Sequence, residues 1–575
     1  MKTIHSSSWA LALALSAGAA AWACNDSVAV IGPDAGTDTD TDTDADTDID
    51  TDTDIDTDSD TDSDTDPGWV GVSLDDVSAP DEYTVLVGFA GAPPAAEAGD
   101  ASIYSIDSDV GGLTIESASY DEAEQVATLT TAKQKLGITY TLTVQPPEEA
   151  TALQDDFLSA DTATFWIVDF ASYEYEQITA ERNAVGAHCV AYIDEDYFAF
   201  TTDAQENFDA NVFPIETDLF IDPPDMDGNG KIVMLGLDGG GYYGGYFDPI
   251  NTYTQEQLDE WGYEGYHSNE IEIIHVAVEY GDFDGGRTIV PHEFQHLLYQ
   301  ERHPNNDYET DTYHNEGLAE CAVRAVNGEY PQAVGYYFGD YGGLIGDGEV
   351  SLVNWTYALY ENYVLAFMFW SYVAGQLDGV DTYGALFDLD SGSPDAVHEF
   401  LVDALGTDFG ETQQNQMIAT FAQAETGLYG YGGFIEIDGM IPPHVSPGVS
   451  SVQLQPFAGT YFPLDQASVD YPGTQGANIV YAGVNGAGAV DLEAPFDVEN
   501  GALAVLNANF EFDAYPSEHS GPDVAAGEVK ALEAALEAGD FSPTWNDPPP
   551  SIFVRPDLLR RWVEARRRQL GGAPL

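Results

Sequence analysis

The sequence predicts a multidomain protein in which an α+β domain is flanked by all-β sandwich modules. Its 575 residues leave room for three or four domains. Residues 68–150 and 445–515 contain short runs in which apolar and polar side chains alternate, with turn residues between the runs. This alternation is typical of antiparallel sandwiches. Between them, residues 160–440 combine strand-like runs with long helical ones, which predicts an α+β domain.

The first module contains five strand-like runs: WVGVSL, YTVLVGF, LTIESASY, VATLTT and ITYTLTV. It resembles the bacterial Ig-like modules of surface proteins. The second module contains VQLQPF, AVDLEA and LAVLNANFEF. In the α+β domain we expect strands at ATFWIVDF, HCVAYIDE and IEIIHVAV, and helices near 354–375, 394–405 and 411–425. The stretch Gly239–Gly245 lacks the Lys-Ser/Thr continuation of a phosphate loop, so we expect a flexible rim of a cleft.

The first 23 residues predict a secretory signal peptide. Met1–Ala23 has a lysine near its start, an apolar run and small residues before Cys24. Two outcomes remain open. Ala21-Trp22-Ala23 fits cleavage of a soluble secreted protein, whereas the same residues with Cys24 form an imperfect lipobox, in which Cys24 would carry lipid. We expect a protein that is secreted or displayed at a bacterial cell surface through this anchor.

Both ends of the chain have unusual composition. Residues 24–67 contain an almost pure Thr/Ser-Asp repeat, which repels itself and predicts a disordered tether. The tail, 516–575, contains DLLRRWVEARRRQL, and six of the fifteen Lys and Arg residues of the chain lie between Arg555 and Arg568. A basic amphipathic helix can bind a membrane or a partner. On so acidic a chain, docking against its own body is the simpler interpretation.

The formal charge of −86 excludes whole classes of partner. Nucleic acids and anionic membranes are bound through positive patches, which this composition does not supply. We therefore expect no nucleic-acid partner, and membrane contact only through the N-terminal lipid. We also expect a monomer.

Residues 292–296 read HEFQH, which is the most informative motif of the chain. On a helix His292 and His296 lie one turn apart on one face, so both can bind one metal ion, and Glu293 can take a proton from water on that ion. We expect Thr288 to cap this helix and Pro291 to lie in its first turn. The alternative is an ordinary amphipathic helix with two solvated histidines. The flanking apolar residues favour a buried helix: Ile289, Val290, Phe294, Leu297 and Leu298.

A third ligand is expected after a spacer of eighteen residues, where the chain reads NEGLAE. Glu316 is the candidate, and Glu320, one turn later, could orient a histidine ring. Zinc with two His, one Glu and an open fourth position is typical of hydrolytic sites. The metzincin extension is absent, and we expect His303 on the surface.

HEFQHLL followed by NEGLAE resembles the gluzincin metallopeptidases, and most of all the hyicolysin-like family of secreted bacterial neutral proteases. The runs DMDGNGKIVML, YGGYFDP and SNEIEIIHV also resemble that family. The resemblance implies a zincin-like fold for 160–440, zinc bound by His292, His296 and Glu316, and Glu293 as general base. It also implies that IEIIHVAV borders the zinc cleft and that a downstream Tyr or His stabilises the oxyanion. Tyr363 is our candidate for that role, although aromatic packing in a buried helix explains it equally well.

The function implied is zinc-dependent endopeptidase activity on extracellular proteins and peptides. The alternative is a non-catalytic surface adhesin with a degenerate protease-like domain. An intact Glu293 argues against the adhesin, because a binding module has no need of a general base.

Two further features leave alternatives open. Asp225, Asp227 and Asn229 match the first half of an EF-hand-type calcium loop, with Asp222 as a further oxygen donor, but the same residues also suit an ordinary turn. In an oxidising compartment Cys189 and Cys321 could form a disulfide, or both could be buried thiols.

Overall fold

The structure is a computed structural model that describes residues 69–508 and 552–553, except 70, 146–152, 171, 173, 194–197, 240–242, 264, 279–282, 305–307, 340–341, 349, 356–359, 446–451, 453, 465 and 471–478. The predicted signal peptide, Cys24, the tether and almost all of the tail lie outside the described residues. All described residues belong to one unit of the chain, Thr65–Leu575. Helices and several β-sheets together make it a mixed α+β, multidomain protein.

The first module is built from two antiparallel sheets with strand orders β1-β2-β5-β4 and β3-β6-β7. Every second side chain of β2 and β6 is buried, as expected for strands with one face in a core. Strand β7 pairs with β6, so this module extends beyond residue 150. Its elements are β1 (Ser73–Asp81), β2 (Thr84–Ala90), α1 (Ala95–Ala98), η1 (Ala101–Ile103), β3 (Tyr104–Asp107), β4 (Ile115–Asp121), β5 (Val126–Thr131), β6 (Thr139–Val144) and β7 (Leu153–Leu158).

The second part is organised by a seven-stranded sheet with the order β20-β12-β13-β11-β10-β9-β8. Strands β10, β11 and β13 run parallel, and all their side chains are buried, because both faces of the sheet are covered. The strands are β8 (Thr162–Asp169), β9 (Glu174–Val185), β10 (Cys189–Ile193), β11 (Ile232–Leu237), β12 (Gly245–Phe247), β13 (Ile273–Ala277) and β20 (Ile552–Phe553).

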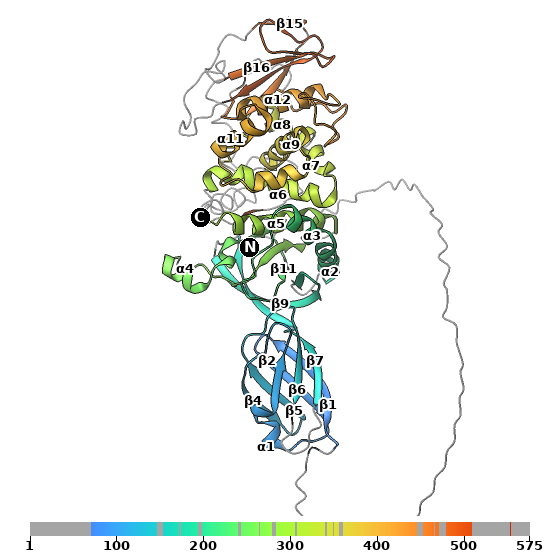
Figure 1. The fold of residues 1–575 in the computed structure, drawn as a ribbon, viewed down its shortest axis with the longest axis vertical. Coiled ribbons are helices and arrows are strands. Elements are labelled where there is room, and N and C mark those ends of the chain that lie inside the picture. The colour runs from blue at the N-terminus through green and yellow to red at the C-terminus, as the bar shows by residue number, and fades with distance from the viewer. Residues whose placement is uncertain are drawn as a thin grey trace, which may run out of the picture. The chain divides into compact units, whose positions relative to one another are not determined.

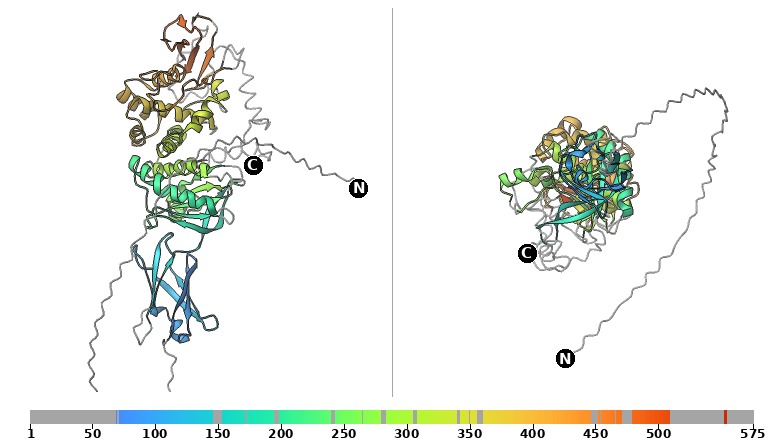
Figure 2. Two further views of the ribbon diagram at one scale, coloured as in Figure 1. Left: turned by 90° about the vertical axis from the view of Figure 1, so that its right-hand side faces the viewer. Right: turned by 90° about the horizontal axis from the view of Figure 1, so that it is seen from below.

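Helices cover one face of this sheet in successive layers. Helix α5 (Phe283–Arg302) packs on β12 and β13, α6 (Tyr308–Asn327) packs on α5, and α9 (Tyr360–Gln376) packs on α6, as Figures 1 and 2 show. Further elements of this part are α2 (Phe198–Asn207), η2 (Phe208–Val212), α3 (Phe213–Leu219), η3 (Pro249–Thr252), α4 (Gln255–Trp261), α7 (Pro331–Phe338), α8 (Gly342–Gly346), α10 (Asp381–Phe387), α11 (Pro394–Leu405) and α12 (Phe409–Ala422).

Two small sheets follow α12, with orders β14-β19-β16-β17 and β15-β18. The run VQLQPF forms no strand at its described positions, because Phe457 adopts a left-handed φ of 56° that interrupts an extended chain. The strands are β14 (Gly459–Pro463), β15 (Ser468–Val469), β16 (Ile479–Val484), β17 (Val490–Asp491), β18 (Phe496–Asp497) and β19 (Ala502–Asn507). Among the described residues, none of the helices is both long enough and apolar enough to cross a membrane.

The start of α5 differs from our prediction. The helix already includes Phe283, so Thr288 is not its cap and Pro291 lies inside the helix rather than in its first turn. Proline has no N–H, so it cannot donate to the carbonyl of Arg287, four residues earlier. The side-chain amide of Asn327, at the end of α6, donates to that carbonyl instead, at 3.0 Å. This bond explains how the helix continues through a proline.

Candidate metal centre

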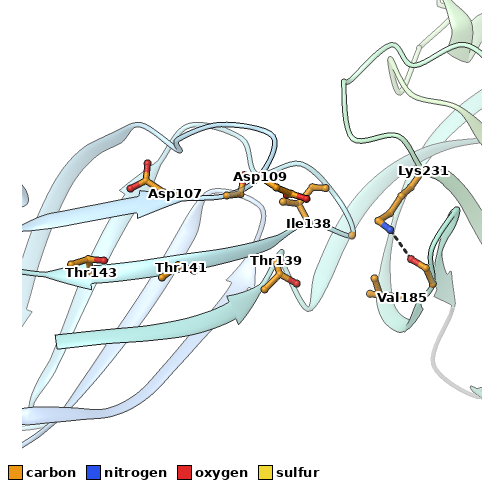
Figure 3. A pocket seen from close by; sticks show the side chains of 11 residues that line it. Asp107, Asp109, Ile138, Thr139, Thr141, Thr143, Val185 and Lys231 are labelled. Carbon is orange, nitrogen blue, oxygen red and sulfur yellow. Dashed lines mark hydrogen bonds between the residues drawn. The ribbon is translucent and has the colours of Figure 1, made fainter. Parts of the chain in front are cut away.

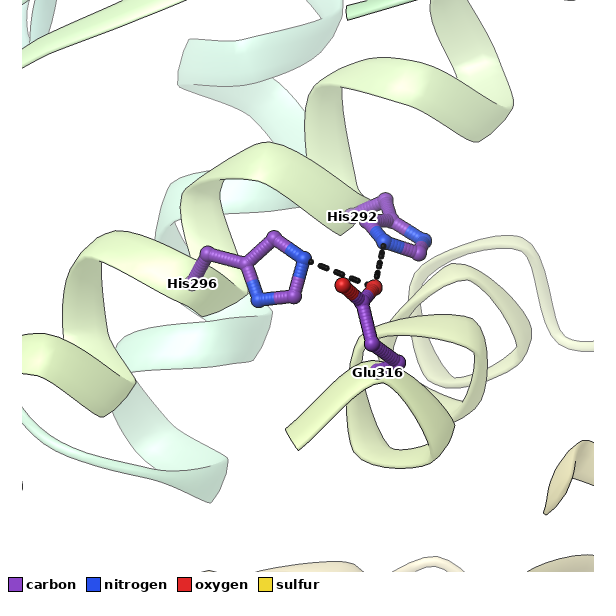
Figure 4. A group of neighbouring side chains, drawn as sticks. All are labelled: His292, His296 and Glu316. Atoms are coloured by element: carbon purple, nitrogen blue, oxygen red, sulfur yellow. Dashed lines mark hydrogen bonds and ion pairs between the residues drawn. The ribbon is translucent and has the colours of Figure 1, made fainter. Parts of the chain in front are cut away.

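The three predicted ligands come together between α5 and α6 (Figure 4). The Nε2 atoms of His292 and His296 each lie 3.2 Å from the same oxygen of Glu316, Oε2. All three side chains are buried. Two histidines one turn apart on α5 thus face one carboxylate on α6, which is the donor set of a catalytic zinc site.

The opposite ring nitrogens are also held. Nδ1 of His292 lies 3.3 Å from Glu320 Oε1, and Nδ1 of His296 lies 3.0 Å from the side-chain oxygen of Asn315. The Asn315 oxygen only accepts hydrogen bonds, so Nδ1 of His296 carries the hydrogen and its Nε2 can present a lone pair to an ion. The negative charge of Glu320 beside Nδ1 of His292 favours the same arrangement in that ring. Glu320 lies where the sequence predicted. Asn315 was missed, although it stands directly before Glu316 in NEGLAE.

The charges around the site favour a bound cation. Burial alone lowers the pKa of His292, but the Glu316 and Glu320 carboxylates reverse this and raise the pKa to about 10. Burial raises the pKa of Glu316, while His296 and His292 lower it to about 2. Positive charge between these groups is therefore stabilised, whether a proton or a metal ion carries it.

Glu293 lies against β12, which pairs with β13 on one side and with β20 on the other. A Cβ atom on Gly245 would lie 2.9 Å from Glu293 Oε1 and 2.4 Å from Ile289, so only glycine allows the strand to pass this close. Gly245 is a buried part of β12, whereas residues 240–242 of the predicted rim lie outside the described residues. Helix α5 packs on both β12 and β13, so the predicted cleft strand IEIIHVAV lies beside the same helix. The glycine-rich run was the signal for this close approach, but its meaning depends on a contact across the fold.

Tyr363 reaches the same site from α9. Its ring centroid lies 6.0 Å from that of His292 and 4.9 Å from that of Trp355. Burial raises the pKa of Tyr363 well above its usual value, and the charge of Glu316 beside it adds to this shift. The phenol therefore stays protonated and able to donate. Tyr363 packs against Trp355 and lies beside His292, so its position is compatible both with aromatic packing and with a role at the site.

Gly317 explains how α6 and α9 come this close. A Cβ atom there would lie 2.5 Å from Nε1 of Trp370 on α9. The glycine of NEGLAE thus lets the two helices approach, which brings Tyr363 of α9 toward Glu316 of α6.

His303 is not on the surface as predicted. Only 6% of it is exposed, and its Nε2 lies 2.9 Å from the carbonyl oxygen of Phe387. The last turn of α5 is covered by α10, which a reading of local sequence could not anticipate.

In the calcium-like turn, the carboxylates of two predicted residues, Asp225 and Asp227, converge with that of Glu272, which was not predicted. The side-chain oxygen of Asn229 accepts the amide hydrogen of Lys231 at 2.5 Å, as in a turn. Burial raises the pKa of Glu272 to about 7 and that of Asp227 to about 6. Calcium binding here stays a prediction.

Cys189 and Cys321 are both buried free thiols, so the disulfide alternative is wrong. Cys189 lies in β10, whereas Cys321 lies in α6, and α5 packs between the sheet and α6. Burial raises the pKa of both thiols, which keeps them protonated and unreactive.

A separate pocket of about 710 Å³ lies away from this site, lined by β3 and β6 and by Val185, Gly186 and Lys231 (Figure 3). The Lys231 ammonium donates to the carbonyls of Gly186 and Ala187, at 2.6 and 3.0 Å. None of the predicted site residues lines this pocket.

Comparison with known proteins gives one relative. The neutral metalloprotease ShpI of Staphylococcus hyicus is 24% identical over 328 residues, which cover 52% of this chain and 68% of the relative. This similarity supports a relation to neutral metalloproteases. No protein-family model matches the chain.

Among solved structures, the N-terminal part of the S-layer protein SbsC is 19% identical and covers 22% of this chain and 33% of its own, with a TM-score of 0.15. Domains 1–6 of SbsC give the same identity and TM-score. The match thus spans a third or less of those chains, and with so low a TM-score it supports no argument about fold or function.

Proposed function

We propose that the protein is a zinc-dependent endopeptidase that acts on extracellular proteins. The observation that supports this most is the convergence of His292, His296 and Glu316, with Glu293 beside them and a neutral metalloprotease as relative. No observation favours the adhesin alternative, for which an intact donor set and a general base have no purpose.

The residues fit zinc. The donors are two imidazole nitrogens and one carboxylate oxygen, a set that suits zinc and leaves room for a fourth ligand. The Nδ1 partners, Asn315 and Glu320, fix the orientation of both rings. When bound, zinc would act as a Lewis acid that polarises the scissile carbonyl and acidifies a water molecule.

Glu293 would hold and move the proton. Its carboxylate, pressed against β12 at Gly245, would accept a proton from the attacking water and later donate it to the leaving amine. The Tyr363 hydroxyl, kept protonated by burial, would donate a hydrogen bond to the oxygen on which negative charge develops.

We also propose an extracellular location, with protein or peptide substrates. The relative and the predicted signal peptide support secretion. A lipid on Cys24 would keep the enzyme at the cell surface, and the Thr/Asp-rich tether would extend it away from that surface.

The decisive experiment separates metal binding from turnover. Glu293→Gln should retain one zinc per chain and lose casein hydrolysis by several orders of magnitude, because the base is gone but the ligands remain. Glu316→Ala should lose the metal as well. Glu301→Gln, on the exposed side of the same helix, makes the same change of charge and should leave both properties intact. Normal hydrolysis by Glu293→Gln would overturn the proposal.

A further inference from the structure

Two large aromatic side chains are exposed at the end of α4. Trp261 is 53% exposed and Tyr263 is 43% exposed, which is unusual for such side chains. They continue a row of rings that also includes Tyr253 and Tyr266. We call these four rings, with the exposed acidic residues around them, the α4 surface. Exposed apolar groups that gather in this way indicate a binding surface.

The rings of the α4 surface stand nearly perpendicular to one another. Tyr253 and Trp261 meet at 75°, Trp261 and Tyr263 at 77°, and Tyr263 and Tyr266 at 79°. A flat ligand such as a sugar ring needs faces that lie in one plane, which this arrangement does not offer. Trp and Tyr rings that stand perpendicular to one another instead expose electron-rich faces in several directions, and such faces attract cations.

The α4 surface is negatively charged, which is the sign that attracts a cation. Glu256, Asp259, Glu260 and Glu270 are all exposed, and the sequence between Tyr253 and Glu270 contains no Lys or Arg. Exposed carboxylates and aromatic rings in one segment favour the guanidinium groups of arginine, which both ion-pair and stack. The surface therefore fits a basic polypeptide segment.

The basic segment of this chain directly follows β20. Strand β20 pairs in parallel with β12, with Ile552 opposite Tyr246 and Phe553 opposite Phe247. Because the strands are parallel, the C-terminal ends of β20 and β12 lie at the same edge of the sheet. From β12 the chain continues through η3 (Pro249–Thr252) to α4. Arg555, the first residue of the basic segment, follows Phe553 by only two positions.

We propose that residues 555–568 dock on the α4 surface, with arginine side chains against Trp261 and Tyr263. A tethered segment needs no high affinity, because pairing of β20 with β12 already gives it a high effective concentration. A basic segment of another protein could carry the right charge, but pairing of β20 with β12 would not hold it near the α4 surface. Docking would also hold β20 on β12, next to Gly245 and Glu293.

Accessibility of the tail to trypsin tests this proposal without any need for peptidase activity. The full chain carrying Glu293→Gln avoids self-cleavage, and mass spectrometry follows tryptic cleavage after Arg560 and Arg561. We expect slow cleavage at low salt and fast cleavage at high salt, because screening weakens exposed ion pairs. Glu256→Gln with Glu260→Gln should accelerate cleavage at low salt by about tenfold, as should Trp261→Ala.

A matched control is available on α11. Glu399 and Asp403 are exposed and four residues apart, like Glu256 and Glu260. Glu399→Gln with Asp403→Asn should leave the cleavage rate unchanged. Equal rates in the parent and in both α4 variants would overturn the proposal. So would equal acceleration by the α11 pair, since the effect would then reflect total charge. If the tail is freely cleaved but an added lysine-rich peptide quenches Trp261 fluorescence, the α4 surface binds a foreign partner instead.

Discussion

The Asn315 side-chain oxygen lies 3.0 Å from Nδ1 of His296, on the side of the ring opposite the Nε2 atom that faces Glu316. Two consecutive residues of α6 therefore contact both nitrogens of one histidine. Glu316 stands where the ion would bind, and Asn315 fixes the tautomer that leaves Nε2 able to bind it. On our proposal, the same turn of helix would supply one metal ligand and the group that orients another.

Asn315→Ala should weaken metal binding while all three ligands remain. Loss of a group that orients a histidine ligand typically costs about 10- to 100-fold in metal affinity. Competition with a chromogenic chelator measures this directly. Asn362→Ala is the matched control, because Asn362 is also buried but donates to the carbonyl of Ser351. Similar zinc affinity in the two variants would argue that Asn315 only fills space.

Tyr363→Phe should lower kcat by about 10²- to 10³-fold, with KM and zinc content nearly unchanged, because only the donor to the oxyanion is lost. Steady-state kinetics on a peptide substrate gives both parameters. Tyr372→Phe, on the same helix, removes a hydroxyl that donates to the carbonyl of Leu428, and it should keep full kcat. A Tyr363→Phe enzyme with wild-type kcat would leave aromatic packing as the role of this residue.

The pair Pro291 and Asn327 predicts a non-additive effect on stability. Asn327→Ala should lower the unfolding free energy by about 0.5 kcal/mol, because the exposed Arg287 carbonyl exchanges its side-chain donor for water. With Pro291→Ala present, the new backbone N–H can donate to that carbonyl, and Asn327→Ala should cost less. Thermal unfolding of the four proteins of this double-mutant cycle measures the coupling. Additive effects would contradict the compensation.

Glu216 predicts a pH-dependent stability. It is fully buried on α3, neither carboxylate oxygen has a hydrogen-bond partner among the residues that the structure describes, and burial raises its pKa well above 4.5. Because the folded pKa is raised, the stability associated with this group is fully present below pH 4.5 and is lost as pH rises toward the folded value. Glu216→Met should therefore raise Tm at neutral pH but give a smaller gain below pH 4.5.

Asp218→Asn is the control for this experiment, since Asp218 lies two residues away on α3 and is exposed. It should not change the pH dependence of Tm. A Glu216→Met protein whose gain in Tm is the same at both pH values would show that packing, and not the carboxylate, sets the difference.

The sequence predicted most of the site because its geometry is local. His292 and His296 share a face by helical period, and Glu316 and Glu320 follow the same rule on the next helix. Alternation likewise predicted four strands of the first module, β2, β4, β5 and β6, whereas β3 and β7 were missed and β1 begins only at Ser73, near the end of the predicted run. Motif spacing fixes such relations before any tertiary contact forms.

Errors arose where a distant segment decides the outcome. Pro291 can lie inside α5 because Asn327 replaces the missing donor, and His303 is buried because α10 covers it. Glu272, which lies just before β13, joins Asp225 and Asp227 although it follows them by more than forty residues. Each case depends on a contact between segments that the local pattern does not encode.

The sequence by itself therefore determined which side chains can bind an ion and move a proton, because helical period sets their spacing. Only the tertiary structure decided which other groups surround these side chains. It placed Asn315 on His296, Gly245 beside Glu293 and Tyr363 near Glu316, and it kept Cys189 and Cys321 apart. The physical reason is that burial, orientation and pKa depend on neighbours brought together by packing between elements, and those neighbours lie far apart along the chain.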